Sequence, residues 1–116
     1  MKRIKNNTAV LIDSEEGLHD LLDCLEDCGA RWAGGEAMRD QSVISYILRG
    51  MEHYKETLEP SEQMCIRIEI DGGGYRMHCG ILYCFSSSIV LDTEMFFDSI
   101  CYNKTTEQLE DISDLF

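Results

Sequence analysis

The side chains of this chain that could do chemistry are mainly carboxylates, and the first run of them follows a helical spacing. Residues 14–28 carry leucines on one face of a predicted helix, and acidic residues fall on the opposite face. No Lys or Arg lies between Lys5 and Arg31 to neutralise them. We call the four residues Glu16, Asp20, Asp23 and Asp27 the acidic ridge. Their negative charge is suited to contact a cationic surface.

The repulsion between the carboxylates of the ridge lowers the stability of the helix, and the ridge has two interpretations. Like charges at helical spacing destabilise a helix by about 0.2–0.5 kcal/mol per pair, which burial of the leucine face offsets. In the first interpretation the ridge is a solvated face that keeps the protein soluble. In the second it imitates a phosphate backbone and docks in the cationic groove of a nucleic-acid enzyme, with an attraction that weakens in salt.

The C-terminal part of the chain repeats the acidic bias. Residues 86–116 hold seven carboxylates and one lysine, a net charge of −6. The last four of these carboxylates join the ridge as predicted partner-binding residues. Trp32 is a further candidate, because aromatic side chains anchor interfaces and its neighbours favour a loop; the alternative is a core tryptophan. The four C-terminal carboxylates are Glu107, Glu110, Asp111 and Asp114.

The composition of the 116-residue chain limits the classes of function. A formal charge of −12 excludes a nucleic-acid binder that works through a basic surface, because phosphate contacts need Lys and Arg. No stretch approaches the roughly 20 apolar residues of a membrane helix. The first 13 residues lack the apolar run of a signal peptide, so we expect a cytoplasmic protein. An apolar fraction of 44% supports one domain over residues 1–116.

Six cysteines are present, and in a cytoplasmic protein they stay reduced and pack as small apolar side chains. No Cys-x-x-Cys pair and no Asp-rich calcium loop occurs, so we predict no metal and no cofactor. Gly72–Gly74 lack the Gly-Lys-Ser/Thr end of a phosphate loop and predict a hairpin turn. The histidines have no recognisable nucleophile beside them, and we predict that the protein is not an enzyme. The cysteines are Cys24, Cys28, Cys65, Cys79, Cys84 and Cys101.

Hydrophobic periodicity predicts the elements that must position these groups. The expected class is α+β, a small antiparallel sheet with helices packed on one face. Residues 103–116 are expected to form a docked or flexible C-terminal helix, because Leu109, Ile112 and Leu115 recur at helical spacing. The other elements are helices at 14–28, 41–58 and 94–100, and strands at 8–13, 31–33, 64–70, 75–85 and 89–91.

Two segments of the chain carry a resemblance. The helix that ends at Gly29, followed by Arg31-Trp32-Ala33-Gly34-Gly35-Glu36, resembles a start common in small acidic proteins encoded by bacteriophages and other mobile elements. Ser88–Phe97 resembles the Ile/Leu, acidic and Phe segment near their end. The resemblance covers residues 8–36 and 64–98, and the helix at 41–58 stands as an insertion. Anti-CRISPR proteins belong to this class of proteins.

The resemblance implies an inhibitor that binds a host nucleic-acid-binding protein, with a Cas effector as the partner we favour. The acidic faces would occlude the cationic surface that holds DNA or RNA, and reversing Asp20, Asp23 and Asp27 to Lys would abolish inhibition. One alternative is an immunity protein against a nuclease toxin. Another is a non-catalytic phage accessory protein that forms a homodimer through its apolar tail, Leu109, Ile112, Leu115 and Phe116.

Overall fold

The leucine face predicted for the first helix lies in the hydrophobic core. The computed structural model describes residues 2–56, 59–85, 87 and 89–113. Helix α1 (Glu15–Asp27) begins at Ser14, whose hydroxyl accepts a 3.0 Å hydrogen bond from the Gly17 amide. The chain leaves the helix through Gly29, which has a φ of 78° that favours glycine. The predicted helix is confirmed, and its fully buried residues are Leu18, Leu21, Leu22 and Leu25.

The main sheet has five strands and is mixed. Strands β2, β4 and β5 are antiparallel neighbours, whereas β6 runs parallel to β2 and β3 runs parallel to β5. The α+β class is confirmed, but the sheet is not purely antiparallel as predicted. Parallel neighbours are joined by long connections, which leave no local signal in the sequence. The order across the sheet is β3 (Arg31–Trp32), β5 (Gly74–Ile81), β4 (Met64–Asp71), β2 (Thr8–Leu11) and β6 (Ile89–Asp92).

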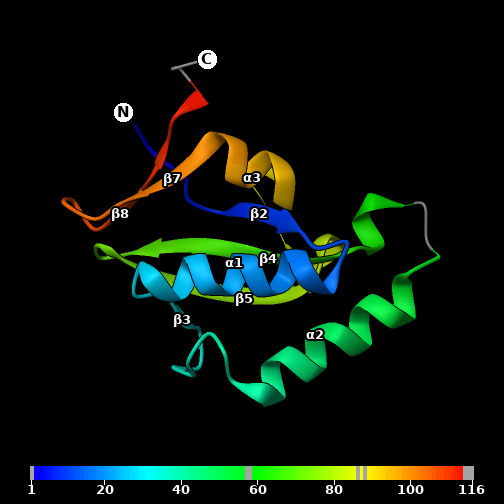
Figure 1. Cartoon of the computed structure of the whole chain (residues 1–116). Helices are drawn as coiled ribbons and strands as arrows, with labels where there is room; N and C mark the ends of the chain where they lie inside the picture. The colour runs from blue at the N-terminus through cyan, green and yellow to red at the C-terminus, as the bar shows by residue number, and fades with distance from the viewer. Residues whose placement is uncertain (1, 57–58, 86, 88, 114–116) are drawn as a thin grey trace.

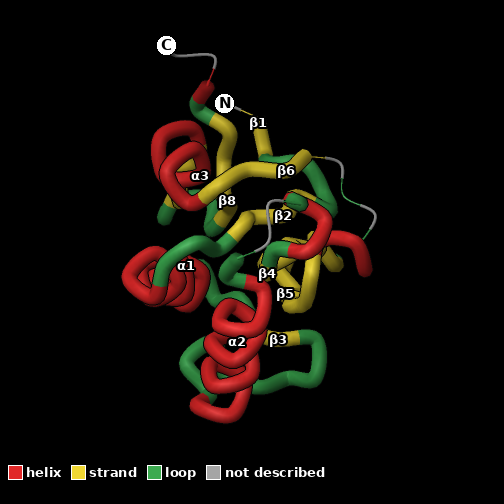
Figure 2. Tube along the Cα trace, turned by 90° about the vertical axis from the view of Figure 1, so that its right-hand side faces the viewer, coloured by secondary structure: helices red, strands yellow, loops and turns green. Residues whose placement is uncertain are grey.

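Three helices cover one side of this sheet, as predicted. Figure 2 shows α1, α2 (Gln41–Tyr54) and α3 (Thr93–Ser99) on the same side of the strands. Asp40 caps α2 by accepting from the Ser42 and Val43 amides, and Asp92 caps α3 by accepting from the Met95 amide. Helix α2 ends at Tyr54, before the predicted end at residue 58; residues 57 and 58 lie outside the described part.

The predicted C-terminal helix is wrong, because the chain forms a second, three-stranded sheet there. Its order is β1 (Lys2–Arg3), β8 (Gln108–Asp111) and β7 (Ile100–Asn103), with antiparallel neighbours (Figure 1). Between β7 and β8 the Asn103 side chain accepts from the amides of Thr105 and Thr106, which folds the chain back.

The strand replaces the helix because pairing with β1 and β7 satisfies the backbone of β8 from both sides. Leu109 is thereby fully buried instead of contributing to one stripe of an exposed tail. Ile112 is half-buried, and its amide donates to the Ser99 carbonyl at 2.7 Å. The other two residues of the predicted apolar tail, Leu115 and Phe116, lie outside the described part of the chain.

A tyrosine hydroxyl joins the two sheets. The Leu109 amide of β8 donates a 2.6 Å hydrogen bond to Tyr75 Oη of β5, and both residues are buried. Tyr75→Phe is expected to lower the free energy of unfolding by about 1–3 kcal/mol, because a buried amide loses its acceptor. Urea titration followed by circular dichroism measures this difference. An unchanged midpoint would contradict the contribution of this hydrogen bond.

Candidate partner-binding surface

The four carboxylates of the acidic ridge point away from the core. Helix α1 buries its leucines against the sheet, so the opposite side of the helix faces solvent. All four ridge residues, Glu16, Asp20, Asp23 and Asp27, are exposed. The spacing therefore predicted the exposed face of α1 correctly, and whether a partner binds there stays a prediction.

Tertiary structure brings one cation to the ridge that the local sequence does not show. Arg39, in the loop before α2, forms a 3.0 Å ion pair between its Nη1 and the Asp23 Oδ1. No such ion pair is found for Glu16, Asp20 or Asp27 with the residues that the structure describes. The part of the ridge that presents uncompensated charge is therefore smaller than the sequence suggested.

The three predicted C-terminal carboxylates that the structure describes, Glu107, Glu110 and Asp111, differ in exposure. Glu110 is only 7% exposed; its Oε2 accepts from Asn103 Nδ2 at 3.3 Å and its Oε1 accepts from the Thr106 hydroxyl at 3.4 Å. Asp111 is half-buried and its Oδ1 accepts from the Ser113 amide. Asp114 lies outside the described residues. Of the four predicted C-terminal residues, Glu107 alone is shown as exposed.

Glu107 lies in the turn between β7 and β8. Burial raises the pKa of the Tyr102 phenol, and the carboxylates of Glu107 and Asp27 are both close enough to raise it further. The β7–β8 turn and the C-terminal end of α1 lie at the same end of the molecule (Figure 1), although Glu107 and Asp27 are 80 positions apart in the sequence. We define the acidic surface as the three exposed ridge residues without an ion pair to the described residues, Glu16, Asp20 and Asp27.

Trp32, the one aromatic residue among the predicted partner contacts, packs in the core. The side chain is 4% exposed, and its Nε1 donates to the Met38 carbonyl at 3.3 Å. Met38 is itself buried. The alternative prediction, that Trp32 is a core residue, is therefore confirmed. Little of the indole surface is exposed to contact a partner.

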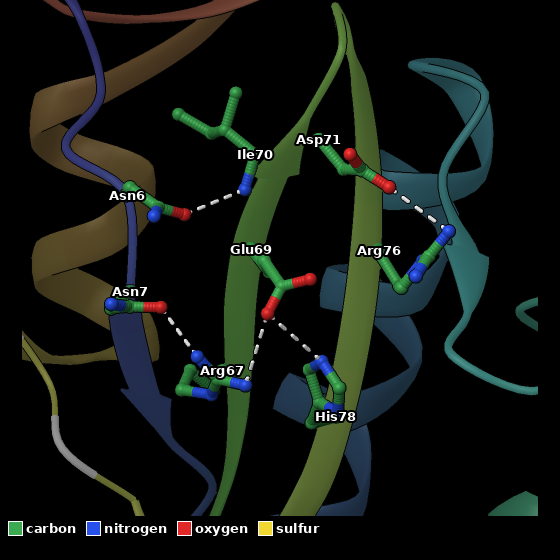
Figure 3. Close-up of polar contacts among 8 residues, drawn as sticks. All are labelled: Asn6, Asn7, Arg67, Glu69, Ile70, Asp71, Arg76 and His78. Atoms are coloured by element: carbon green, nitrogen blue, oxygen red, sulfur yellow. Dashed lines mark hydrogen bonds and ion pairs between the residues drawn. The ribbon is translucent and has the colours of Figure 1, made fainter.

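The side of the sheet opposite the helices carries a ladder of paired polar residues that sequence reasoning did not single out (Figure 3). Glu69 Oε2 lies 3.3 Å from Arg67 Nη2 and 3.5 Å from His78 Nε2. Arg67 also donates to the Asn7 side chain, and its guanidinium lies over the Phe85 ring. The period-two alternation of residues 64–70 was the signal for this face. Arg67 and Glu69 carry opposite charges, so this pair adds no net charge to that side of the sheet.

The cysteines are free thiols, and most of them are shielded. Burial raises the pKa of Cys24 and Cys79 to about 11, and that of Cys28 and Cys65 to about 12. Thiols with such pKa values are weak nucleophiles at neutral pH, because the thiolate is the reactive form. Cys84 and Cys101 are exposed.

We expect the thiol reagent DTNB to modify Cys84 and Cys101 first in the native protein, and the other four only after unfolding. A buried thiol keeps its proton where the unfolded chain, with a thiol pKa near 9, loses it. Stability is therefore expected to be full below about pH 9 and to decline as the pH rises toward 11–12. Rapid modification of all six thiols at pH 7 would contradict the burial.

Neither a metal-binding cluster nor a membrane-spanning helix is found in residues 2–56, 59–85, 87 and 89–113. Within them, no three His, Cys, Asp or Glu side chains are grouped so that they could hold a metal ion. No helix in the same part of the chain has the length and apolarity to cross a membrane. Comparison of the chain with protein-family models, curated proteins and solved structures finds no match.

Proposed function

We propose that this protein binds a cationic, nucleic-acid-binding surface of another protein and inhibits it by occlusion. A CRISPR effector of the host bacterium is the partner class that we favour. The proposal combines the resemblance to small acidic proteins of mobile elements with the charge of the chain. The exposed carboxylates would meet the Arg and Lys side chains that otherwise hold DNA or RNA.

The observation that carries the proposal is the acidic surface of α1. Glu16, Asp20 and Asp27 follow one another along the outer face of a single helix, without an ion pair to the described residues. Asp27 also lies in the last turn of α1, which contains no basic residue, although the helix dipole favours a cation there. A helix that keeps carboxylates where they are unfavourable is consistent with selection for contact with a cation.

The test is capture from a bacterial lysate that contains a CRISPR system. The immobilised full-length protein is washed at 50 mM and at 500 mM salt, and the retained proteins are identified by mass spectrometry. We expect a nucleic-acid-binding protein that is retained at low salt and lost at high salt, because screening weakens contacts between exposed charges. The purified partner should then lose binding to its DNA or RNA when the protein is added.

Two variants with equal charge changes separate a surface from a general effect of acidity. Asp20→Lys/Asp27→Lys reverses two residues of the acidic surface, whereas Glu52→Lys/Glu56→Lys reverses two exposed residues, one on α2 and one just after its end. The control also breaks the exposed Glu52–Lys55 ion pair, which has little effect on stability. We expect the first variant to lose capture and the second to retain it. Equal behaviour of the two variants would reject the acidic surface, and recovery of the chain alone would favour the self-association alternative.

A further inference from the structure

One edge of the main sheet ends in an unpaired stretch of strand. Strand β5 extends over eight residues, but β3, its neighbour at this edge, has two. The pairing covers Arg76 and Met77 of β5. Beyond Met77, no strand among the described residues pairs with this edge. From there to Ile81, β5 is paired only with β4, on its other side.

The hydrogen bonds already made show which backbone groups face this open edge. The Ala33 amide donates to the Met77 carbonyl at 2.9 Å, so the polar groups of Met77 point toward β3. Residues two apart in a strand point the same way, and therefore Cys79 and Ile81 also direct their N–H and C=O groups outward. The Leu82 amide donates to the Gln63 carbonyl at 2.9 Å, which agrees with the even-numbered residues facing β4.

A cavity lies beside this edge. It has a volume of about 360 Å³ and lies between α2, the loop after β3 and the segment after β5. Its walls are largely apolar and aromatic, and Tyr46 of α2 is 52% exposed. The residues that matter here are Trp32, Glu36, Val43, Tyr46, Cys79 and Phe85. A strand that prolonged the pairing of β3 would pass along this cavity.

The charge at the cavity indicates what kind of segment fits it. Glu36 is exposed, and its carboxylate lies directly over Gly34, where any Cβ would clash with it. The same carboxylate is close enough to Cys79 to contribute to the raised pKa of that thiol. A basic side chain on an added strand would therefore find an acidic partner beside the open edge. A second copy of this chain would bring a second Glu36 and a charge of −12 instead.

We propose that the edge of β5 at Cys79–Ile81 accepts an extended, basic segment of a partner protein by strand addition. The backbone of the added segment would pair with the outward groups of Cys79 and Ile81, as in other cases of strand addition. Its apolar side chains would enter the cavity beside Tyr46 and Phe85, and a Lys or Arg would face Glu36. This surface is distinct from the acidic surface of α1, so either proposal can fail without the other.

The test uses the full-length protein and a capped hexapeptide, Ac-Val-Lys-Val-Lys-Val-Lys-NH₂, followed by amide NMR. We expect the amide signals of Cys79 and Ile81 to shift on titration and their hydrogen exchange to slow. A peptide of the same sequence with N-methylated alternate amides has the same charge but cannot pair as a strand. We expect it to bind at least about tenfold more weakly, since it cannot form the backbone hydrogen bonds to this edge.

A matched pair of charge variants tests the role of Glu36. Glu36→Gln is expected to weaken binding of the hexapeptide by about threefold, in line with the loss of one exposed charge contact. Glu56→Gln removes the same charge from an exposed position on α2's C-terminal flank and should leave the affinity unchanged.

Three results would overturn the proposal. The first is no shift of Cys79 or Ile81 at millimolar peptide, and the second is equal affinity for the N-methylated peptide. The third is a set of shifts confined to α1, which would mean that the lysines contact the acidic surface by charge alone.

Discussion

Replacing Trp32 with alanine is expected to lower the free energy of unfolding by about 3–5 kcal/mol. The indole is nearly fully buried, and its Nε1 donates to the Met38 carbonyl at 3.3 Å. The Trp32 amide also donates to the Glu36 carbonyl, so this residue fixes the loop that leads to α2. Domains of this size have only about 5–15 kcal/mol of stability, so the variant should be close to unfolding. Urea titration followed by circular dichroism measures the loss.

Trp32→Phe is the control for the indole N–H. It keeps an aromatic ring in the core but removes the donor to Met38, and we expect a loss of about 1–2 kcal/mol. The smaller loss would show that most of the contribution comes from packing. A loss below about 1 kcal/mol for Trp32→Ala would contradict a core role and return this residue to the predicted partner contacts.

Phe96→Ala is expected to have an effect of similar size, about 3–5 kcal/mol. Phe96 is fully buried on α3, the helix that follows β6 of the main sheet and leads directly into β7 of the second sheet. A cavity at this position removes packing between α3 and both sheets. Hydrogen exchange should therefore increase in β7 and β8 as well as in α3, in addition to the change in urea midpoint.

Phe97 offers a matched control for this substitution. It is the same residue type on the same helix, and it is 41% exposed. Its ring lies edge to face with that of Phe96, with 5.4 Å between the ring centroids. Phe97→Ala should cost only about 0.5–1.5 kcal/mol, since it loses mainly the aromatic pair. Equal costs for the two alanine variants would mean that α3 packs differently from the structure.

Local patterns predicted the elements of this protein whose hydrogen bonds and buried faces are formed within short segments. The leucine spacing of α1 and the apolar stripe of α2 each define one face of a helix. The hairpin of β4 and β5 alternates with period two on both sides of its glycine-rich turn. Ser14 and Asp92 are caps of the residue types that favour helix N-termini, and they accept from the amides of Gly17 and Met95. The exposure of the acidic ridge follows directly, because it is the side of α1 opposite the leucines.

The rest depended on contacts between residues far apart in the sequence. The spacing of Leu109 and Ile112 fits a helix, but pairing with β1 and β7 makes this segment a strand and buries Glu110. Packing in the core decided that Trp32 is not an interface residue. The ion pair of Arg39 with Asp23 likewise required the tertiary structure.

The division has a physical reason. The sequence by itself determined helix faces, caps and the hairpin, because periodicity and capping act over a few residues. Only the tertiary structure decided that Glu110 is buried, that Asp23 is paired with Arg39 and that one edge of the main sheet stays open. Those outcomes depend on burial and on contacts between segments far apart in the sequence. The local pattern of one segment does not encode the position of the segment with which it pairs.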